Sequence, residues 1–187
     1  MKIGIAGIGG IGSNVARHIA QAGIGTVRNI NFIKIVDFDC VEVSNLNRQF
    51  YKVSQAGLKK TDSLEINLKQ INPDMVIEKI DKQLCHEDME EIFSDCDIIV
   101  EGFDEKLLKK MIIEKFSETK KIIVSASGIA GNNLDAISIK KMGNCYIVGD
   151  FVSDQDDHEL FPPKIATIAA MMADIVLKAA NNKDSKE

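Results

Sequence analysis

A chain of 187 residues, 45% of them hydrophobic, is long enough to bury the core of one α/β domain. A net charge of -5 and a pI near 5.3 argue against nucleic-acid binding, which normally requires a basic surface. The four cysteines form no CxxC pair, so we expect reduced thiols and neither a zinc site nor a disulfide framework.

The sequence predicts no membrane span and no cleaved leader. The longest apolar run, Ile165 to Val176, contains Asp174 and is followed by Lys178, which favours an amphipathic helix. The N-terminal stretch has a lysine and apolar residues, but its glycines predict a folded turn instead of a signal peptide. We therefore expect a cytoplasmic protein that binds neither a membrane nor a nucleic acid.

A glycine-rich turn follows the first predicted strand. Residues 7–12 read GIGGIG and match the GxGxxG pattern that joins a strand to a helix at nucleotide sites. Gly7 permits a tight turn, Gly9 lets the backbone approach a phosphate, and Gly12 lets the helix pack close to the strand. The following helix would direct its free N–H groups at an anion.

The second predicted strand ends in acidic residues. Asp37 follows Gly12 by 25 positions, close to where a dinucleotide fold places its ribose-binding carboxylate. Asp39 comes next, and the polar run 44–49, SNLNRQ, then carries one arginine, Arg48. A nucleotide site needs both kinds of group, because ribose hydroxyls donate to carboxylates and phosphates accept from guanidinium groups.

Helices and strands alternate along the chain. We predict strands at 2–6, 32–36, 76–80, 98–100, 121–125, 134–139 and 145–148, and helices at 13–22, 58–71, 87–93, 106–116 and 164–180. This order predicts one α/β domain over residues 1–180, with a Rossmann-like, doubly wound, mostly parallel sheet and antiparallel strands toward the C-terminus. Residues 149–163 are expected to form a mobile acidic loop, and 181–187 a frayed polar tail.

Six short motifs occur in order over the first 73 residues: GIGGIG, AGIG, VDFD, SNLNRQ, GLKK and INP. With these motifs the chain resembles the ThiF/MoeB/HesA adenylyltransferases, relatives of the ubiquitin-activating enzymes, in a short ThiF-type form. The resemblance continues more faintly through EGFDE at 101–105 and the last helix, so it covers nearly the whole chain.

The resemblance implies an enzyme that binds ATP and Mg²⁺ and transfers AMP to the C-terminal glycine carboxylate of a small partner protein. That partner would be a ubiquitin-like sulfur carrier ending in Gly-Gly, and a ThiS-like carrier of thiamine biosynthesis is the one we expect. A homodimer formed through the sheet edge and the final helix is also implied.

The same resemblance assigns roles to individual residues. Asn45 and Arg48 contact the phosphate chain, Lys60 of GLKK is the phosphate-binding lysine, and Asp104 of EGFDE is the magnesium ligand. Arg48, Lys60 and Asp104 are therefore the candidate catalytic residues. The candidate cofactor-binding residues are the glycines of the turn, the two aspartates after the second strand, and the three side chains that would contact the phosphates. They are Gly7, Gly9, Gly10, Gly12, Asp37, Asp39, Asn45, Arg48 and Lys60.

These residue types also suit the chemistry itself. A carboxylate that attacks the α-phosphorus of ATP brings two anions together, so the site must neutralise charge with an arginine, a lysine and a metal ion. The nucleophile is already ionised at neutral pH. Catalysis then depends on positioning and electrostatics.

Each assignment has a structural alternative. Asp37 could cap the end of its strand, Arg48 and Lys60 could be exposed surface bases, and Asp104 could cap a helix. The chain also departs from the family pattern: the connection between the first helix and the second strand is longer, and Glu105 replaces the asparagine that often follows the metal ligand. We find no match for the partner-subunit arginine, the zinc-binding CxxC pairs or the sulfur-transfer cysteine of relatives.

Two other functions therefore stay open. An NAD-dependent Rossmann oxidoreductase would use the same glycine-rich turn, although hydride transfer needs no phosphate clamp of the kind that SNLNRQ and Lys60 suggest. A non-catalytic nucleotide-binding adaptor for a carrier protein would explain the missing arginine.

Overall fold

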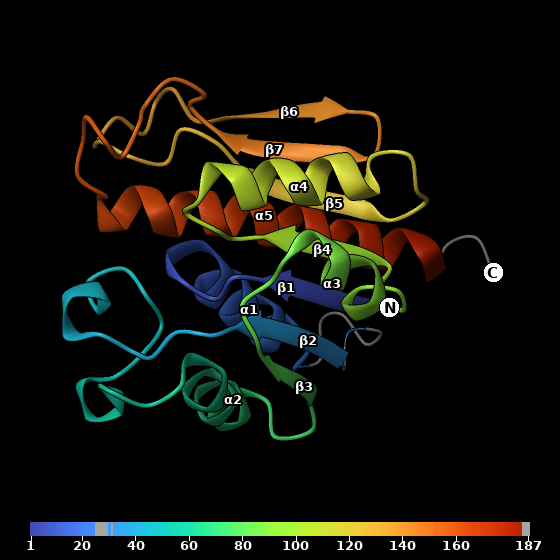
Figure 1. Cartoon of the computed structure of the whole chain (residues 1–187), viewed down its shortest axis with the longest axis horizontal. Helices are drawn as coiled ribbons and strands as arrows, with labels where there is room; N and C mark the ends of the chain where they lie inside the picture. Colours follow the sequence, from blue (N-terminus) through green and yellow to red (C-terminus); the bar gives the residue numbers. More distant parts are fainter. Residues whose placement is uncertain (25–29, 31, 185–187) are drawn as a thin grey trace.

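The computed structural model describes residues 1–24, 30 and 32–184. Seven strands of this part of the chain form one sheet in the order β3-β2-β1-β4-β5-β7-β6 (Figure 1). The strands are β1 (Lys2–Ala6), β2 (Phe32–Asp37), β3 (Val76–Asp81), β4 (Ile98–Glu101), β5 (Ile122–Ala126), β6 (Ser138–Met142) and β7 (Cys145–Gly149). All neighbours are parallel except β6 and β7, which form an antiparallel hairpin. The predicted fold class is confirmed.

Helices cover both faces of the sheet. One face carries α1 (Gly10–Ala22), α2 (Lys60–Ile71) and α5 (Pro162–Asp184), and the other carries α3 (His86–Ile92) and α4 (Lys106–Phe116), which lie in front of the sheet in Figure 1. Two short 3-10 turns, η1 (Val43–Asn45) and η2 (Val53–Gln55), lie between β2 and α2. No helix among the described residues has the length and apolar character needed to cross a bilayer.

Two apolar cores result from the alternation of side chains along the strands. Ile3 and Ile5 of β1 point toward α1 and α5, whereas Ala6 points toward α3 and α4. The central strands are buried on both faces, as expected of a parallel sheet covered by helices. Their carboxyl ends therefore meet at one edge of a rigid scaffold.

Several element boundaries differ from the prediction. Helix α1 begins at Gly10, not Ser13, and α2 begins at Lys60, not Leu58. The second shift has a tertiary cause, because Val41 N–H donates to Leu58 C=O and Gly57 N–H donates to Val41 C=O, which keeps this stretch extended.

The C-terminal boundaries also differ. Strand β6 begins at Ser138, not Leu134, and α5 starts at Pro162, where a proline lacks only an N–H that would be unpaired anyway. The predicted end of this helix at Ala180 is wrong, because α5 continues to Asp184 through the expected frayed tail. Two predicted features lie partly outside the described residues. They are the last part of the tail, 185–187, and the longer connection after α1, at 25–29 and 31, which includes Gly25 of AGIG.

The acidic loop is anchored at its base. We call residues 150–161 the strap, since they connect β7 to α5. Lys164 is fully buried, and its Nζ lies 2.6 Å from Asp150 Oδ2. Asp150 Oδ1 also accepts from the N–H groups of Val152 and Ser153, both at 2.9 Å. A buried ion pair thus ties the first residues of the strap to the start of α5.

The pair predicts a pH-dependent stability. Burial by itself raises the pKa of Asp150, but the hydrogen bonds from Lys164, Ser153 and Val152 outweigh it and hold that pKa below its usual range. The stabilisation is present above the pKa of an unfolded aspartate, about 3.9, and is lost as the pH falls through the lower pKa of the folded protein.

We therefore expect Asp150→Asn to lower the free energy of unfolding at neutral pH by about 3 kcal/mol, because it leaves a buried ammonium without its counter-ion. Urea unfolding at a series of pH values checks this. The difference from the wild type should shrink below about pH 4. A difference that stays constant over the whole acid range would contradict the role of the carboxylate charge.

Candidate active site

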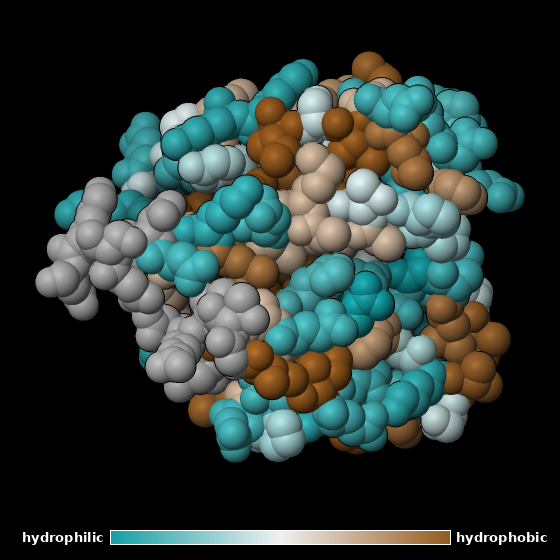
Figure 2. All heavy atoms as spheres, turned by 180° about the vertical axis from the view of Figure 1, so that it is seen from behind, coloured by the Kyte–Doolittle hydropathy of each residue, from teal (hydrophilic) through white to brown (hydrophobic). Residues whose placement is uncertain are grey.

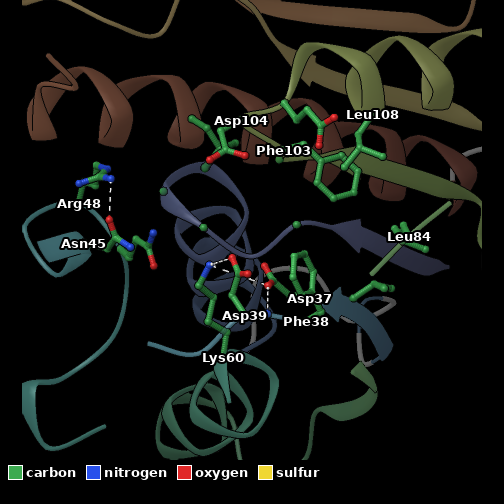
Figure 3. A pocket seen from close by; sticks show the side chains of 18 of the residues that line it. Asp37, Phe38, Asp39, Asn45, Arg48, Lys60, Leu84, Phe103, Asp104 and Leu108 are labelled. Atoms are coloured by element: carbon green, nitrogen blue, oxygen red, sulfur yellow. Dashed lines mark hydrogen bonds and ion pairs between the residues drawn. The ribbon is translucent and has the colours of Figure 1, made fainter. Parts of the chain in front are cut away.

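A cavity of about 360 Å³ lies at the carboxyl ends of the central strands (Figure 3). It sits where the chain leaves β1 in one direction and β4 in the other, which is the usual ligand position in doubly wound sheets. Of the sequence-predicted site residues, all but Gly12 line it, namely Gly7, Gly9, Gly10, Asp37, Asp39, Asn45, Arg48, Lys60 and Asp104.

The glycine-rich turn is shaped by close packing. Gly7 has φ +79°, and a Cβ there would lie 2.9 Å from Phe103 Cδ1. Gly12 lies outside the cavity, and a Cβ on it would overlap Gly7 O, at 2.0 Å. Gly12 therefore lets α1 approach β1, while Gly7, Gly9 and Gly10 form the cavity wall.

The start of α1 offers free donors to this wall. No side chain caps the helix, because the N-cap residue is Gly9. Ser13 Oγ of the first turn donates to Gly9 O at 2.6 Å and accepts the Phe50 N–H at 3.0 Å. The first backbone N–H groups of an uncapped helix lack acceptors and carry partial positive charge. They suit a phosphate group.

Asp37 is buried at the end of β2. Its Oδ2 accepts the Ile8 N–H at 2.8 Å, and its Oδ1 accepts the Asp39 N–H at 2.9 Å. Burial raises the pKa of Asp37, although the Lys60 charge and the two N–H donors oppose the rise. Asp37 thus caps the strand end and also presents a desolvated carboxylate, which further hydroxyl donors would stabilise.

Lys60 and Asp39 form an ion pair inside the cavity. Lys60 Nζ lies 2.7 Å from Asp39 Oδ2 and 3.8 Å from Asp37 Oδ1, and Lys60 as a whole is 5% exposed. The alternative of an exposed surface base is therefore excluded. A phosphate that reached Lys60 would have to share it with Asp39 or displace that carboxylate.

Arg48 faces the same cavity from the segment after η1. Its Nη2 donates to Asn45 Oδ1 at 2.7 Å, and its Nη1 donates to Asn47 Oδ1 at 3.0 Å. Asn14 of α1 fixes the segment, since its Nδ2 donates to both Gly10 O and Arg48 O. Within the described part of the chain Arg48 has no carboxylate partner, so its charge is available to a bound anion.

Asp104 lies on the wall opposite Lys60 (Figure 3). The residue at the N-terminal boundary of α4 is Glu105, whose side chain makes no capping bond, so the helix-cap alternative for Asp104 is wrong. The Asp104 carboxylate forms no hydrogen bond or ion pair with any other described residue. Only its C=O is engaged, by Gln155 Nε2 at 3.4 Å.

Sequence reasoning missed the apolar part of the site. Four apolar residues gather at one end of the cavity and come from three separate parts of the chain, namely Phe38, Leu84, and Phe103 with Leu108 (Figure 3). Phe38 stands between the two aspartates of VDFD, but no pattern in the sequence links it to the other three. Together they form a slot for a flat apolar group such as a nucleobase.

A second cavity of about 250 Å³ adjoins the first. The two share Phe103, Asp104 and Ile129, and the strap residues from Phe151 to Gln155 form one wall of the second cavity. The strap is held there by Lys106, whose Nζ pairs with Asp154 Oδ2. A molecule bound in the second cavity would therefore lie next to a molecule bound in the first cavity, and the two would meet at Asp104.

The described residues hold no group of three or more His, Cys, Asp or Glu side chains arranged to bind a metal. Cys40 and Cys85 are exposed, Cys96 and Cys145 are buried, and all four are free thiols. Burial raises the pKa of Cys96 to about 12 and that of Cys145 to about 11, so neither is a thiolate at neutral pH.

Comparison with known proteins places this architecture in a family. The chain belongs to the ThiF family, whose model matches residues 1–187. It is 33% identical over 147 residues to the adenylyltransferase and sulfurtransferase UBA4 of Candida glabrata, covering 78% of this chain and 33% of that protein. It is 31% identical over 129 residues to the molybdopterin-synthase adenylyltransferase of Haemophilus influenzae, covering 68% of this chain and 51% of that protein. The chain thus spans about a third to a half of the length of these relatives.

Solved structures share the fold. The E. coli tRNA N6-threonylcarbamoyladenosine dehydratase TcdA in complex with ATP has a TM-score of 0.87 and 20% identity, covering 100% of this chain and 88% of that one. E. coli MccB with ATP has a TM-score of 0.75 and 21% identity, covering 97% and 55%. At these identities the likeness concerns the fold alone.

Close packing at the turn yields a paired prediction. Gly12→Ala should lower the free energy of unfolding by at least about 2 kcal/mol, because its Cβ meets backbone atoms that cannot move aside. Gly10→Ala is the control in the same helix. Its Cβ would meet only Ile165 Cγ2 at 3.3 Å and the more distant Arg48, and side chains can adjust. Equal losses in the two variants, measured by urea unfolding, would contradict this packing.

Proposed function

We propose that this protein binds ATP with Mg²⁺ and adenylates the C-terminal carboxylate of a small ubiquitin-like sulfur carrier. The observation that carries the proposal is the convergence of Asp37, Arg48, Lys60 and Asp104 on one cavity beside a glycine-rich turn. Relatives named as adenylyltransferases support this reaction over others built on the same fold.

The cavity fits ATP part by part. The apolar slot suits adenine, Asp37 suits the ribose hydroxyls, and the turn with the start of α1 suits the phosphates. Arg48 and Lys60 flank the phosphate path from opposite sides. Lys60 would exchange its contact with Asp39 for one with a phosphate oxygen, which leaves Asp39 free to accept from the sugar or from solvent.

Asp104 fits a magnesium ligand. Its carboxylate lines the cavity without a hydrogen-bond partner in the described residues, and Mg²⁺ on a nucleotide typically uses one or two carboxylates together with the phosphates. The ion would neutralise charge on the phosphate oxygens and on departing pyrophosphate. Glu105, which also lines the cavity, is a second carboxylate within this region.

The reaction joins the carrier's carboxylate oxygen to the α-phosphorus of ATP and breaks the bond from that phosphorus to the bridging oxygen of pyrophosphate. No proton transfer is needed, because the nucleophile is ionised and the leaving group departs as an anion. Arg48 and Lys60 lower the barrier by stabilising the negative charge that accumulates on the phosphates. Walls formed by the glycine-rich turn and the apolar slot would keep the nucleotide oriented.

We expect two cation variants to lose activity selectively. Arg48→Ala and Lys60→Ala should each lower carrier-dependent ATP–pyrophosphate exchange by at least about tenfold, which corresponds to one charge contact in the transition state. Lys110→Ala is the matched control, since Lys110 pairs with Glu114 on the exposed side of α4 and lines neither cavity, and its rate should stay within about twofold of the wild type. Wild-type rates in both cation variants would contradict the proposed roles.

Nucleotide choice separates this function from an NAD-dependent oxidoreductase. ATP with Mg²⁺ should raise the melting temperature by mass action, and NAD at the same concentration should raise it much less. Equal or greater stabilisation by NAD would favour the oxidoreductase. A protein that binds ATP but catalyses no exchange with any carrier would instead be the adaptor.

The second cavity suits the carrier's extended tail. It leads to Asp104 and is bounded by Ser127, Gly128 and the strap. We propose that the strap is a lid that closes over a Gly-Gly tail, with Phe151 and Val152 as apolar contacts and the pair of Lys106 with Asp154 as a latch.

The lid is tested by replacing residues 152–159 with a short Gly-Ser linker that keeps Asp150 and Lys164. Carrier adenylation should fall by at least about tenfold, since an unfixed tail loses its orientation at the nucleotide, whereas ATP affinity should be retained. Calorimetry measures the affinity, and pyrophosphate release measures adenylation. Unchanged adenylation would leave the strap without a catalytic role.

The finer assignments also belong to this proposal. The carrier is ThiS-like and the pathway is thiamine biosynthesis in the cytoplasm, on the basis of the short ThiF-type sequence. The protein acts as a homodimer through α5 and the sheet edge. In support, α5 exposes Ala170 and half-exposes Ala166, Met171 and Leu177, and Figure 2 shows apolar surface among hydrophilic groups on that face of the molecule. Sedimentation velocity measures the mass in solution.

A further inference from the structure

We propose that Glu101 is a positioning residue for the nucleotide site. Buried at the end of β4, it fixes the turn that carries Asp104 and so sets the contribution of Asp104 to magnesium-dependent nucleotide binding. The inference rests on the proposed function, because it takes Asp104 as the magnesium ligand. Glu101 itself lines neither cavity.

Glu101 is a fully buried carboxylate with three donors. Its Oε1 accepts the Phe103 N–H at 2.7 Å, and its Oε2 accepts from Ser125 Oγ and Lys109 Nζ, both at 2.6 Å. The Lys109 side chain is 21% exposed and supplies the opposing charge. Charge-assisted bonds of this length are strong and directional, so they restrict the groups they join.

These contacts hold both ends of the segment that bears Asp104. The bond to the Phe103 N–H fixes the residue directly before Asp104, and the bond to Lys109 fixes the first turn of α4 directly after it. Neither contact engages the Asp104 carboxylate, which stays free to bind a ligand. Glu101 thus determines where that carboxylate is presented.

The 102–104 segment, which carries Asp104, is also packed against the glycine-rich turn. A Cβ on Gly102 would lie 2.6 Å from Gly7 O and 3.0 Å from Gly12 N, and the Phe103 ring lies against Gly7. Gly102 N–H donates to Ala6 O at 2.8 Å. A shift of the 102–104 segment would therefore change the distance between the glycine-rich turn and Asp104, and with it the position of Asp104 relative to a nucleotide bound at that turn.

A purely structural role of Glu101 and a positioning role predict different effects on nucleotide affinity. Loss of structural support weakens nucleotide binding with and without magnesium alike, whereas misplacement of Asp104 weakens only the part that magnesium adds. We therefore compare ATP affinity, by calorimetry, in Mg²⁺ and in EDTA. The ratio of the two dissociation constants is the magnesium gain, and it requires no turnover.

In Glu101→Gln the side chain keeps its size and can still accept the Phe103 N–H, but it loses the charge that holds Lys109. We expect the magnesium gain to fall at least about fivefold, while affinity in EDTA changes less than about twofold. Ser125→Ala removes one bond and keeps the ion pair, so it should reduce the gain by about twofold. If Glu101→Gln does not fold, the magnesium gain of Ser125→Ala tests the proposal, and an unchanged gain in that variant overturns it.

Asp95→Asn is the matched control, because it breaks a 2.7 Å ion pair with the buried Lys34 before the start of β4, at the other end of the strand. It should lower stability and leave the magnesium gain unchanged. A wild-type gain in Glu101→Gln, equal losses in Mg²⁺ and EDTA, or a wild type without any gain would each overturn the proposal. Pyrophosphate exchange by the wild type tests adenylation separately, so failure of that reaction is distinguishable from failure of this inference.

Discussion

The structure depends on the close approach of three backbone segments at the carboxyl edge of the sheet. Gly7, Gly12 and Gly102 lie so near one another that a Cβ on Gly12 or on Gly102 would collide with Gly7 O. This contact brings the start of α1, the end of β1 and the turn after β4 together. The glycine-rich turn and Asp104 therefore line one cavity.

The charged groups of the site are already partly compensated before any ligand binds. Lys60 pairs with Asp39, Arg48 is held by asparagine oxygens, and Glu101 is matched by Lys109. Such pairing keeps buried charges tolerable in a desolvated cavity. The pairing also holds the two cations in place in advance. The contact between Lys60 and Asp39 is the one that an anionic ligand at Lys60 would have to share or replace.

Much of the fold could be predicted from the sequence, because short apolar runs mark the central strands and apolar residues recur at helical spacing in α1, α4 and α5. The boundaries that failed depend on distant partners, as at Leu58, whose C=O is bonded to Val41. The polar site residues were recognisable from their order along the chain. Their pairing was not, since Asp39 and Lys60 meet only when the loop between them folds back.

The apolar slot and the role of Glu101 could not be predicted from the sequence for a related reason. The slot combines Phe38, Leu84 and the pair of Phe103 and Leu108 from three separate parts of the chain, so no local pattern identifies it. Glu101 reads as an ordinary acid at the end of a strand, and only its burial beside Ser125 and Lys109 distinguishes it. Tertiary placement, not residue type, defines both features.

Adenylation of a carrier is the central claim, and intact-protein mass spectrometry tests it most directly. A ThiS-like carrier is incubated with the protein, ATP, Mg²⁺ and pyrophosphatase, and the same carrier without its terminal glycine serves as the control. We predict an added AMP on the full-length carrier alone. A carrier that stays unmodified while the protein binds ATP would contradict the adenylyltransferase function.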